Sequence, residues 1–142
     1  MAVLIDTSFL LAVTYEKDER HLAARQARQN LKEQQVIPLP VVQEIFQLIV
    51  ARRSYLHALQ VFDTIRSSSS IIERLTDEDL ARMSEIMRQY ADAELDFADT
   101  AIMAIAERLN IMQVYTFDRV ISACSVLNTR TTSNCYLNSS FM

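Results

Sequence analysis

Short apolar runs rich in β-branched residues alternate along this chain with longer segments whose apolar residues recur at helical spacing. The short runs predict buried strands and the longer segments predict helices. Strands that alternate with helices indicate a parallel, doubly wound α/β sheet. We therefore expect a single domain over residues 1–142, with four to five strands flanked by helices. The expected strands are 2–5, 36–39, 71–75 (an edge strand) and 112–117, and the expected helices are 18–35, 41–53, 55–65, 77–90 and 97–109.

Local signals mark where several of these helices begin and which side they bury. Pro40 suits the first turn of a helix, and Ser54 and Asp96 suit N-cap positions. Thr76 and Asp79 have the spacing of a capping box. Apolar stripes predict two core-facing sides, formed by Val41, Ile45, Leu48 and Ile49 in one helix and by Leu56, Leu59, Phe62 and Ile65 in the next.

Four acidic residues follow or interrupt these apolar segments, namely Asp6, Glu44, Asp99 and Asp118. Asp6 and Asp118 come directly after expected strands, and the other two lie near the starts of helices that follow strands. Sites in doubly wound sheets form at the carboxyl ends of strands, so all four carboxylates can face one cleft. Clustered carboxylates repel one another unless a cation lies among them, and hard divalent cations prefer oxygen ligands. The pattern predicts a divalent metal site.

Taken singly, these acids have ordinary interpretations as well. Asp96 fits an N-cap better than a ligand position. Asp99, in a first helical turn, could equally complement the helix dipole. Glu44 lies beside a buried stripe, where an unpaired charge is costly, so either a metal or an arginine should accompany it.

Composition excludes several classes of function. The 142 residues include no glycine, so phosphate-binding loops of the Walker and Rossmann types are absent. A net charge of −4 argues against binding nucleic acid by bulk electrostatics. The sequence has no apolar run long enough to cross a bilayer and starts without a basic leader, which favours a cytoplasmic protein with no membrane contact.

Other reactive side chains lack a site-forming pattern. Cys124 and Cys135 have neither zinc-ligand spacing nor nearby histidines, and we interpret them as reduced thiols. His21 and His57 occur in polar, helix-surface contexts and are poor candidates for a catalytic base. Arg25, Arg28, Arg52 and Arg53 fit either contacts to RNA or an acidic partner, or solvated helix faces.

Four motifs in order resemble one family. MAVLIDTSFLLA, the Pro-Leu-Pro-Val-Val-x-Glu segment, YADAELDFADTAIMAIAERLNI and TFDR are similar to those of bacterial PIN-domain proteins of the VapC toxin type, and the resemblance covers residues 1–119. It implies a Mg²⁺- or Mn²⁺-dependent endoribonuclease, the toxin of a toxin–antitoxin pair. Asp6, Glu44 and Asp99 would form the inner metal set, and Asp118 would act through water or position the metal. Thr7, Ser8 and Thr116 would line the same pocket, with Asp96 as a further supporting residue.

The resemblance also implies partners. A small antitoxin protein would wrap the helical surface and plug the acidic cleft with a basic side chain, RNA would be the substrate, and homodimers are common in the family.

The C-terminal segment departs from the family pattern. Residues 120–142 are rich in Ser, Thr and Asn where a closing strand is expected. Codons for residues 120–138 can be chosen so that the neighbouring reading frame spells a family-like ending and a stop. We therefore favour a frameshift after Arg119. It would remove the final strand of the sheet and could reduce or abolish the ribonuclease activity.

Three alternatives follow. A phosphoryl-accepting receiver domain would need an Asp ending the third strand and a Lys ending the fifth, but the only lysines are Lys17 and Lys32. An Asp-x-Asp phosphatase is disfavoured because Ser8 stands two residues after Asp6. A catalytically impaired PIN-fold module that only binds a protein or RNA stays open.

Overall fold

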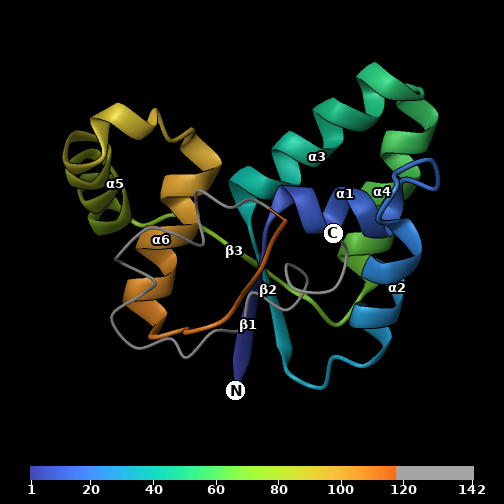
Figure 1. Ribbon diagram of the computed structural model, residues 1–142, viewed down its shortest axis with the longest axis horizontal. Coiled ribbons are helices and arrows are strands. Elements are labelled where there is room, and N and C mark those ends of the chain that lie inside the picture. The colour runs from blue at the N-terminus through green and yellow to red at the C-terminus, as the bar shows by residue number, and fades with distance from the viewer. Residues whose placement is uncertain (118–142) are drawn as a thin grey trace.

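The computed structural model describes residues 1–117, which form four strands, six α-helices and one short 3-10 helix (Figure 1). Predictions about Asp118 and about residues 120–142 lie outside the described residues. The elements are, in order, β1 (Ala2–Ile5), α1 (Thr7–Thr14), α2 (His21–Gln29), β2 (Gln34–Pro38), α3 (Leu39–Arg52), α4 (Tyr55–Ser67), β3 (Ile71–Glu73), α5 (Asp77–Gln89), η1 (Ala91–Ala93), α6 (Phe97–Leu109) and β4 (Val114–Tyr115).

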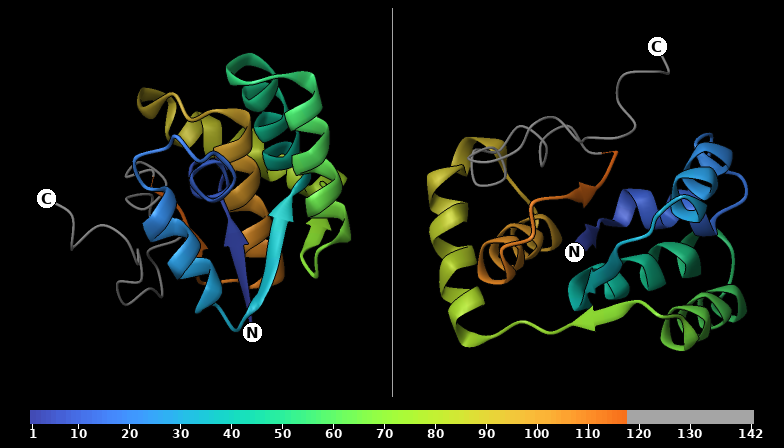
Figure 2. Two further views of the ribbon diagram at one scale, coloured as in Figure 1. Left: turned by 90° about the vertical axis from the view of Figure 1, so that its right-hand side faces the viewer. Right: turned by 90° about the horizontal axis from the view of Figure 1, so that it is seen from below.

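The four strands form one parallel sheet in the order β3-β2-β1-β4, which confirms the predicted doubly wound α/β class. Leu4 of β1 is in register with Val36 of β2 on one side and with Val114 of β4 on the other. Helices α5 and α6 lie on one side of the molecule, while α1 to α4 lie on the other (Figures 1 and 2). Because the strands are parallel, their carboxyl ends reach the same edge of the sheet, from which α1 and α3 begin.

The core surrounds β1 and α6. Val3 and Leu4 are fully buried and Ile5 is nearly so, as expected for a central parallel strand covered on both faces. Helix α6 buries a continuous run from Thr100 to Ala106. Among the described residues, no helix has the length and apolar character needed to cross a membrane.

The predicted caps are confirmed. The Ser54 hydroxyl accepts a hydrogen bond from the backbone N–H of His57 at the start of α4. Capping boxes open α5, with Thr76 and Asp79, and α6, with Asp96 and Asp99.

Two helices differ from the prediction. Helix α1 was not predicted, because five of its eight residues are buried apolar side chains and no polar stripe reveals a helical period. Helix α2 covers only His21–Gln29 of the expected 18–35, since Gln34 and Gln35 already belong to β2. The ring nitrogen Nδ1 of His21 lies 2.8 Å from the carbonyl oxygen of Ala12 and ties α2 to α1, so this histidine is not merely a surface residue.

The predicted core face of α4 is confirmed at two of its four positions. Ile65 is buried and Phe62 is partly buried against the core, but Leu56 is 61% exposed and Leu59 is also exposed. Ala58, which was not predicted, is buried instead. The helix packs on α3, and its most buried side chain is the small Ala58 rather than a leucine. The expected stripe of α3 is confirmed at Val41, Ile45 and Ile49, while Leu48 is half-buried.

An ion-pair cluster joins β3, α5 and α6. The guanidinium Nε of Arg108 donates to both carboxylate oxygens of buried Asp79 at 3.0 Å, and its Nη2 donates to Glu73 at 2.9 Å. Burial raises the pKa of Asp79, but hydrogen bonds from Arg108 and Thr76, together with the Arg108 charge, outweigh burial and lower it. The ionised carboxylate therefore stabilises the fold.

We predict that Asp79→Asn lowers the free energy of unfolding by about 2 kcal/mol at pH 7, because it removes a charge-assisted pair and weakens a cap. A lowered folded pKa contributes stability above the ordinary value of 3.8 and loses it as pH falls through the folded value. The deficit should therefore stay nearly full down to about pH 4 and shrink only as pH falls below the ordinary value towards the folded one. Urea unfolding at pH 7 and at roughly pH 2 measures it, with Arg82→Gln, which removes two partly exposed ion pairs, as a control expected to cost under about 1 kcal/mol. A deficit that is as large at the acidic pH as at pH 7 would contradict the ionic contribution.

Candidate active site

The site begins where β1 ends. Ile5 pairs in register with Tyr115 of β4, and the N–H of Asp6 donates to the Tyr115 carbonyl at 3.0 Å. Asp6 and Thr116 are consequently the first residues beyond the paired strands, side by side at the sheet edge. Both are buried.

The Asp6 carboxylate is held by hydroxyl groups. Its Oδ2 accepts hydrogen bonds from Thr116 Oγ1 at 2.6 Å and from Ser8 Oγ at 3.0 Å. Ser8 Oγ in turn accepts from the N–H of Phe117 at 2.9 Å, which fixes the chain after β4 against α1. Although Asp6 occupies the N-cap position of α1, its side chain makes no capping bond to that helix. The carboxylate is directed to the strand edge.

Glu44 approaches the same place from α3. The residue is half-buried in the second turn of the helix, and its Oε2 accepts a hydrogen bond from Thr7 Oγ1 at 3.1 Å. Burial raises the pKa of the Glu44 carboxyl most, the Thr7 hydroxyl lowers it, and the charges of Asp96 and Asp6 raise it further; the net shift is upward. The charges of Asp6 and Asp96 are thus close enough to act on Glu44. The sequence suggested either a metal or an arginine beside Glu44, and within residues 1–117 no arginine forms an ion pair with it.

Asp96 and Asp99 lie at the start of α6. The N–H of Asp99 donates to Asp96 Oδ1 at 2.8 Å, and the N–H of Asp96 donates to Asp99 Oδ2 at 3.4 Å. Asp96 is exposed and, with Glu44, lines a cavity of about 320 Å³ between α3 and α6. The N-cap interpretation of Asp96 is confirmed, and Asp99 is the reciprocal partner in that cap.

The donor set suits a hard cation. In residues 1–117 no three acidic or histidine side chains lie close enough to form a metal-binding group by themselves, and Asp118 lies beyond that range. Mg²⁺, however, usually keeps several waters and takes only one or two protein carboxylates. Asp6 and Glu44 supply oxygen donors, and a cation would relieve both the burial of the Glu44 charge, which is the main cause of its raised pKa, and the smaller repulsion from Asp96 and Asp6.

One residue near the site was missed at the sequence level. The guanidinium of Arg20 lies 4.2 Å from the centre of the Phe117 ring, which itself stacks on Phe9. Arg20 precedes α2 in a polar segment whose sequence gives no sign of contact with Phe117, two residues after β4. Such a contact across 97 residues depends on the fold alone.

The sequence matches the family model of the PIN domain over residues 3–126, and the chain therefore belongs to the PIN-domain family. The match extends seven residues beyond Arg119, into the segment that departs from the expected ending. No curated protein sequence matches the chain.

Solved structures of VapC toxins share this fold. VapC20 of Mycobacterium tuberculosis, described as a toxin that cleaves the sarcin-ricin loop, superposes with a TM-score of 0.80 at 22% identity, covering 85% of this chain and 93% of its own. VapBC2 of Rickettsia felis, bound to a promoter DNA fragment, matches at 0.64 and 13% identity, over 86% and 92% of the two chains. VapBC-1 of nontypeable Haemophilus influenzae matches at 0.59 and 12%, over 86% and 90%.

We predict that Glu44→Gln stabilises the metal-free protein at pH 7.5. A raised folded pKa means that the carboxyl contributes stability below its ordinary value of 4.5 and loses it as pH rises through the folded value. Glutamine removes the charge and keeps an acceptor for Thr7, so the melting temperature should rise by roughly 3–5 °C for about 1 kcal/mol.

Thermal melts with a chelator at pH 7.5 and pH 4.5 measure this effect. The gain should be smaller at the lower pH, and Glu19→Gln, an exposed acid in a loop, should show no gain at either. A Glu44→Gln protein that is less stable than wild type at pH 7.5 would refute the repulsion.

Proposed function

We propose that this chain is a metal-dependent endoribonuclease and the toxin component of a toxin–antitoxin pair. The observation that carries the proposal is the geometry of two carboxylates: Asp6 at the sheet edge is held by the hydroxyls of Ser8 and Thr116, and half-buried Glu44 of α3 is held by the hydroxyl of neighbouring Thr7. Membership of the PIN family and likeness to VapC folds support it.

The chain's own residues would divide the work as follows. Asp6 and Glu44 hold Mg²⁺ or Mn²⁺, with Asp99 from α6 completing the inner set and Asp118 acting through water. Thr116 and Ser8 keep the Asp6 carboxylate in one orientation, and Thr7 does the same for Glu44. Asp96 supports Asp99 through the capping box.

When bound, the metal supplies charge neutralisation at the phosphodiester and lowers the pKa of a water molecule. The protein contributes by holding the ligand carboxylates in position. Hydroxyls that orient metal ligands are worth 10- to 100-fold in affinity or activity, roughly, in comparable sites. The half-buried setting of Glu44 also strengthens its electrostatic interactions relative to bulk water.

The similar structures also support the proposed partners, which are an RNA substrate and an antitoxin protein. VapC20 is described as cleaving the sarcin-ricin loop, which supports an RNA substrate here. Two of the similar structures are VapBC assemblies, which supports an antitoxin protein as the partner. We also propose a homodimer, and a site of action in the cytoplasm where RNA is present.

We predict that purified protein cleaves RNA in the presence of MgCl₂ or MnCl₂ and that EDTA stops cleavage. Labelled structured RNAs resolved on denaturing gels provide the measurement. If the chain as it stands is inactive, the same assay applies to a protein carrying the family-like ending after Arg119. Cleavage insensitive to EDTA, or none in either protein at any metal concentration, would overturn the proposal.

We further predict that Asp6→Asn, Glu44→Gln and Asp99→Asn each lower cleavage by at least ~100-fold, because each removes a ligand charge. Ser8→Ala and Thr116→Ala should lower it by roughly 10- to 100-fold through lost orientation. Asp92→Asn, an exposed acid of η1, is the matched control and should cleave like wild type. Circular dichroism confirms folding, and a fully active ligand variant would remove that residue from the site.

The same variants separate the enzyme from a binding module. Metal binding to the folded state raises its melting temperature by mass action. Wild type should gain stability from MnCl₂, and Asp6→Asn should not. If the protein binds RNA but gains no stability from metal and cleaves nothing, the binding-module alternative holds instead.

A further inference from the structure

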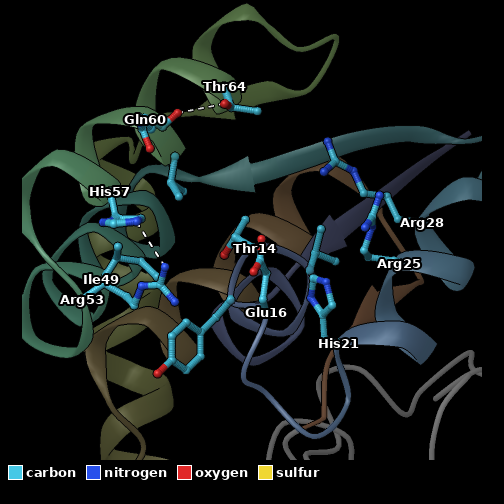
Figure 3. A pocket seen from close by; sticks show the side chains of 13 residues that line it. Thr14, Glu16, His21, Arg25, Arg28, Ile49, Arg53, His57, Gln60 and Thr64 are labelled. Carbon is cyan, nitrogen blue, oxygen red and sulfur yellow. Dashed lines mark hydrogen bonds between the residues drawn. The ribbon is translucent and has the colours of Figure 1, made fainter.

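A second pocket lies at the opposite end of α1 from Asp6. It has a volume of about 410 Å³ and is walled by α2 on one side and by the end of α3 and α4 on the other (Figure 3). In Figure 3, Arg25 and Arg28 of α2 extend from one wall, Arg53 and His57 stand on the other, and Thr14 lies between them.

The pocket concentrates positive charge in a protein whose net charge is −4. Its lining includes three arginines and two histidines against one carboxylate, that of Glu16, and the arginines carry the positive charge. Within the described part of the chain, Arg25, Arg28 and Arg53 form no ion pair, whereas Arg20, Arg82 and Arg108 all do. Clustered arginines without carboxylate partners favour an anionic ligand.

The wall formed by α4 is pre-oriented. Nη2 of Arg53 lies 3.1 Å from His57 Nε2, and His57 Nδ1 lies 2.6 Å from Ser54 Oγ. An arginine only donates, so Nε2 accepts and Nδ1 carries the proton toward Ser54. This chain of bonds holds one guanidinium at the pocket rim.

Helix α1 fixes the distance from this pocket to the acidic site. Asp6 and Ser8 mark its start, and Thr14 at its last position lines the pocket. Eight residues at 1.5 Å each span about 12 Å, and a helical nucleic-acid strand advances about 3.4 Å per nucleotide. A helical strand that ran parallel to α1 would therefore cover its length in about three to four nucleotides.

We propose that this pocket binds backbone phosphates of the RNA substrate, a few nucleotides from the bond that is cut. The inference rests on the proposed ribonuclease function. The pocket would supply attraction for the RNA backbone, which the acidic site lacks because carboxylates repel phosphates. Arginines on two facing walls suit an RNA strand, which carries one negative phosphate per nucleotide and could pass between the walls. Arginine also binds phosphate through two parallel hydrogen bonds.

The test measures RNA binding without cleavage. In an Asp6→Asn background with EDTA, fluorescence anisotropy gives the Kd of labelled single-stranded RNAs from 3 to 12 nucleotides, over a range of KCl concentrations. We expect affinity to rise once the RNA is long enough to reach the pocket. Adding Arg25→Gln and Arg28→Gln should remove that length advantage, weakening binding roughly tenfold per arginine.

The salt dependence gives an independent measure. Each phosphate contact to single-stranded nucleic acid contributes about 0.7 to the slope of log K against log salt, so the double change should lower the slope by about 1.4. Arg88→Gln, an exposed arginine of α5 on the far side of the molecule, is the control and should change neither quantity. Circular dichroism and melting confirm that each variant folds.

The outcomes are distinct. If the double variant binds long RNA as tightly as its background and with the same slope, the proposal is wrong. If instead the double variant loses only affinity for a labelled polyglutamate peptide, the pocket serves an acidic protein segment and the proposal is again wrong. Absence of cleavage by wild type, with length-dependent binding retained, would refute the ribonuclease function and leave the phosphate site standing.

Discussion

The parallel pairing of β1 between β2 and β4 is the constraint on which the site depends. Val3, Leu4 and Ile5 are buried, so the register that places them in the core also decides where the strand leaves the sheet. A slip by one residue would exchange the faces of every side chain. In the observed register Asp6 emerges beside Thr116, and α1 begins at the next residue.

Three aspartates near helix starts show how context assigns roles. Asp79 and Asp96 both take part in capping boxes, where the side chain and a backbone N–H three residues away are satisfied locally. Asp6 holds an equivalent N-cap position but bonds to Ser8 and Thr116 instead. The difference comes from β4: only Asp6 has a strand-end hydroxyl from a distant segment close to its carboxylate. Asp6 is therefore oriented by hydroxyls of the candidate site rather than by the first turn of its own helix.

What could be predicted from sequence was mostly local. The strands, the caps of α4, α5 and α6, and the acids at strand ends all depend on residues within a few positions of one another. Helix α1 was missed because it is buried nearly all round and has no polar face. The predicted face of α4 was right at Phe62 and Ile65 but wrong at Leu56 and Leu59, because Ala58 takes the most buried position of the helix. The bond from Thr7 to Glu44 spans 37 residues, and no pattern in the sequence specifies it.

The dipole of helix α1 favours the charged groups that lie near each of its two ends. Its aligned peptide dipoles place partial positive charge at the N-terminus, beside Asp6, and partial negative charge at the C-terminus, where the arginine-lined pocket opens. Each end therefore stabilises the charges gathered there, although the effect falls off within a turn. The two ends of α1 are about 12 Å apart, which exceeds the screening length of roughly 8 Å at physiological salt. If the two sites act on one RNA, as we propose, the rigid helix between them keeps the acids and the arginines apart, so that they do not neutralise each other.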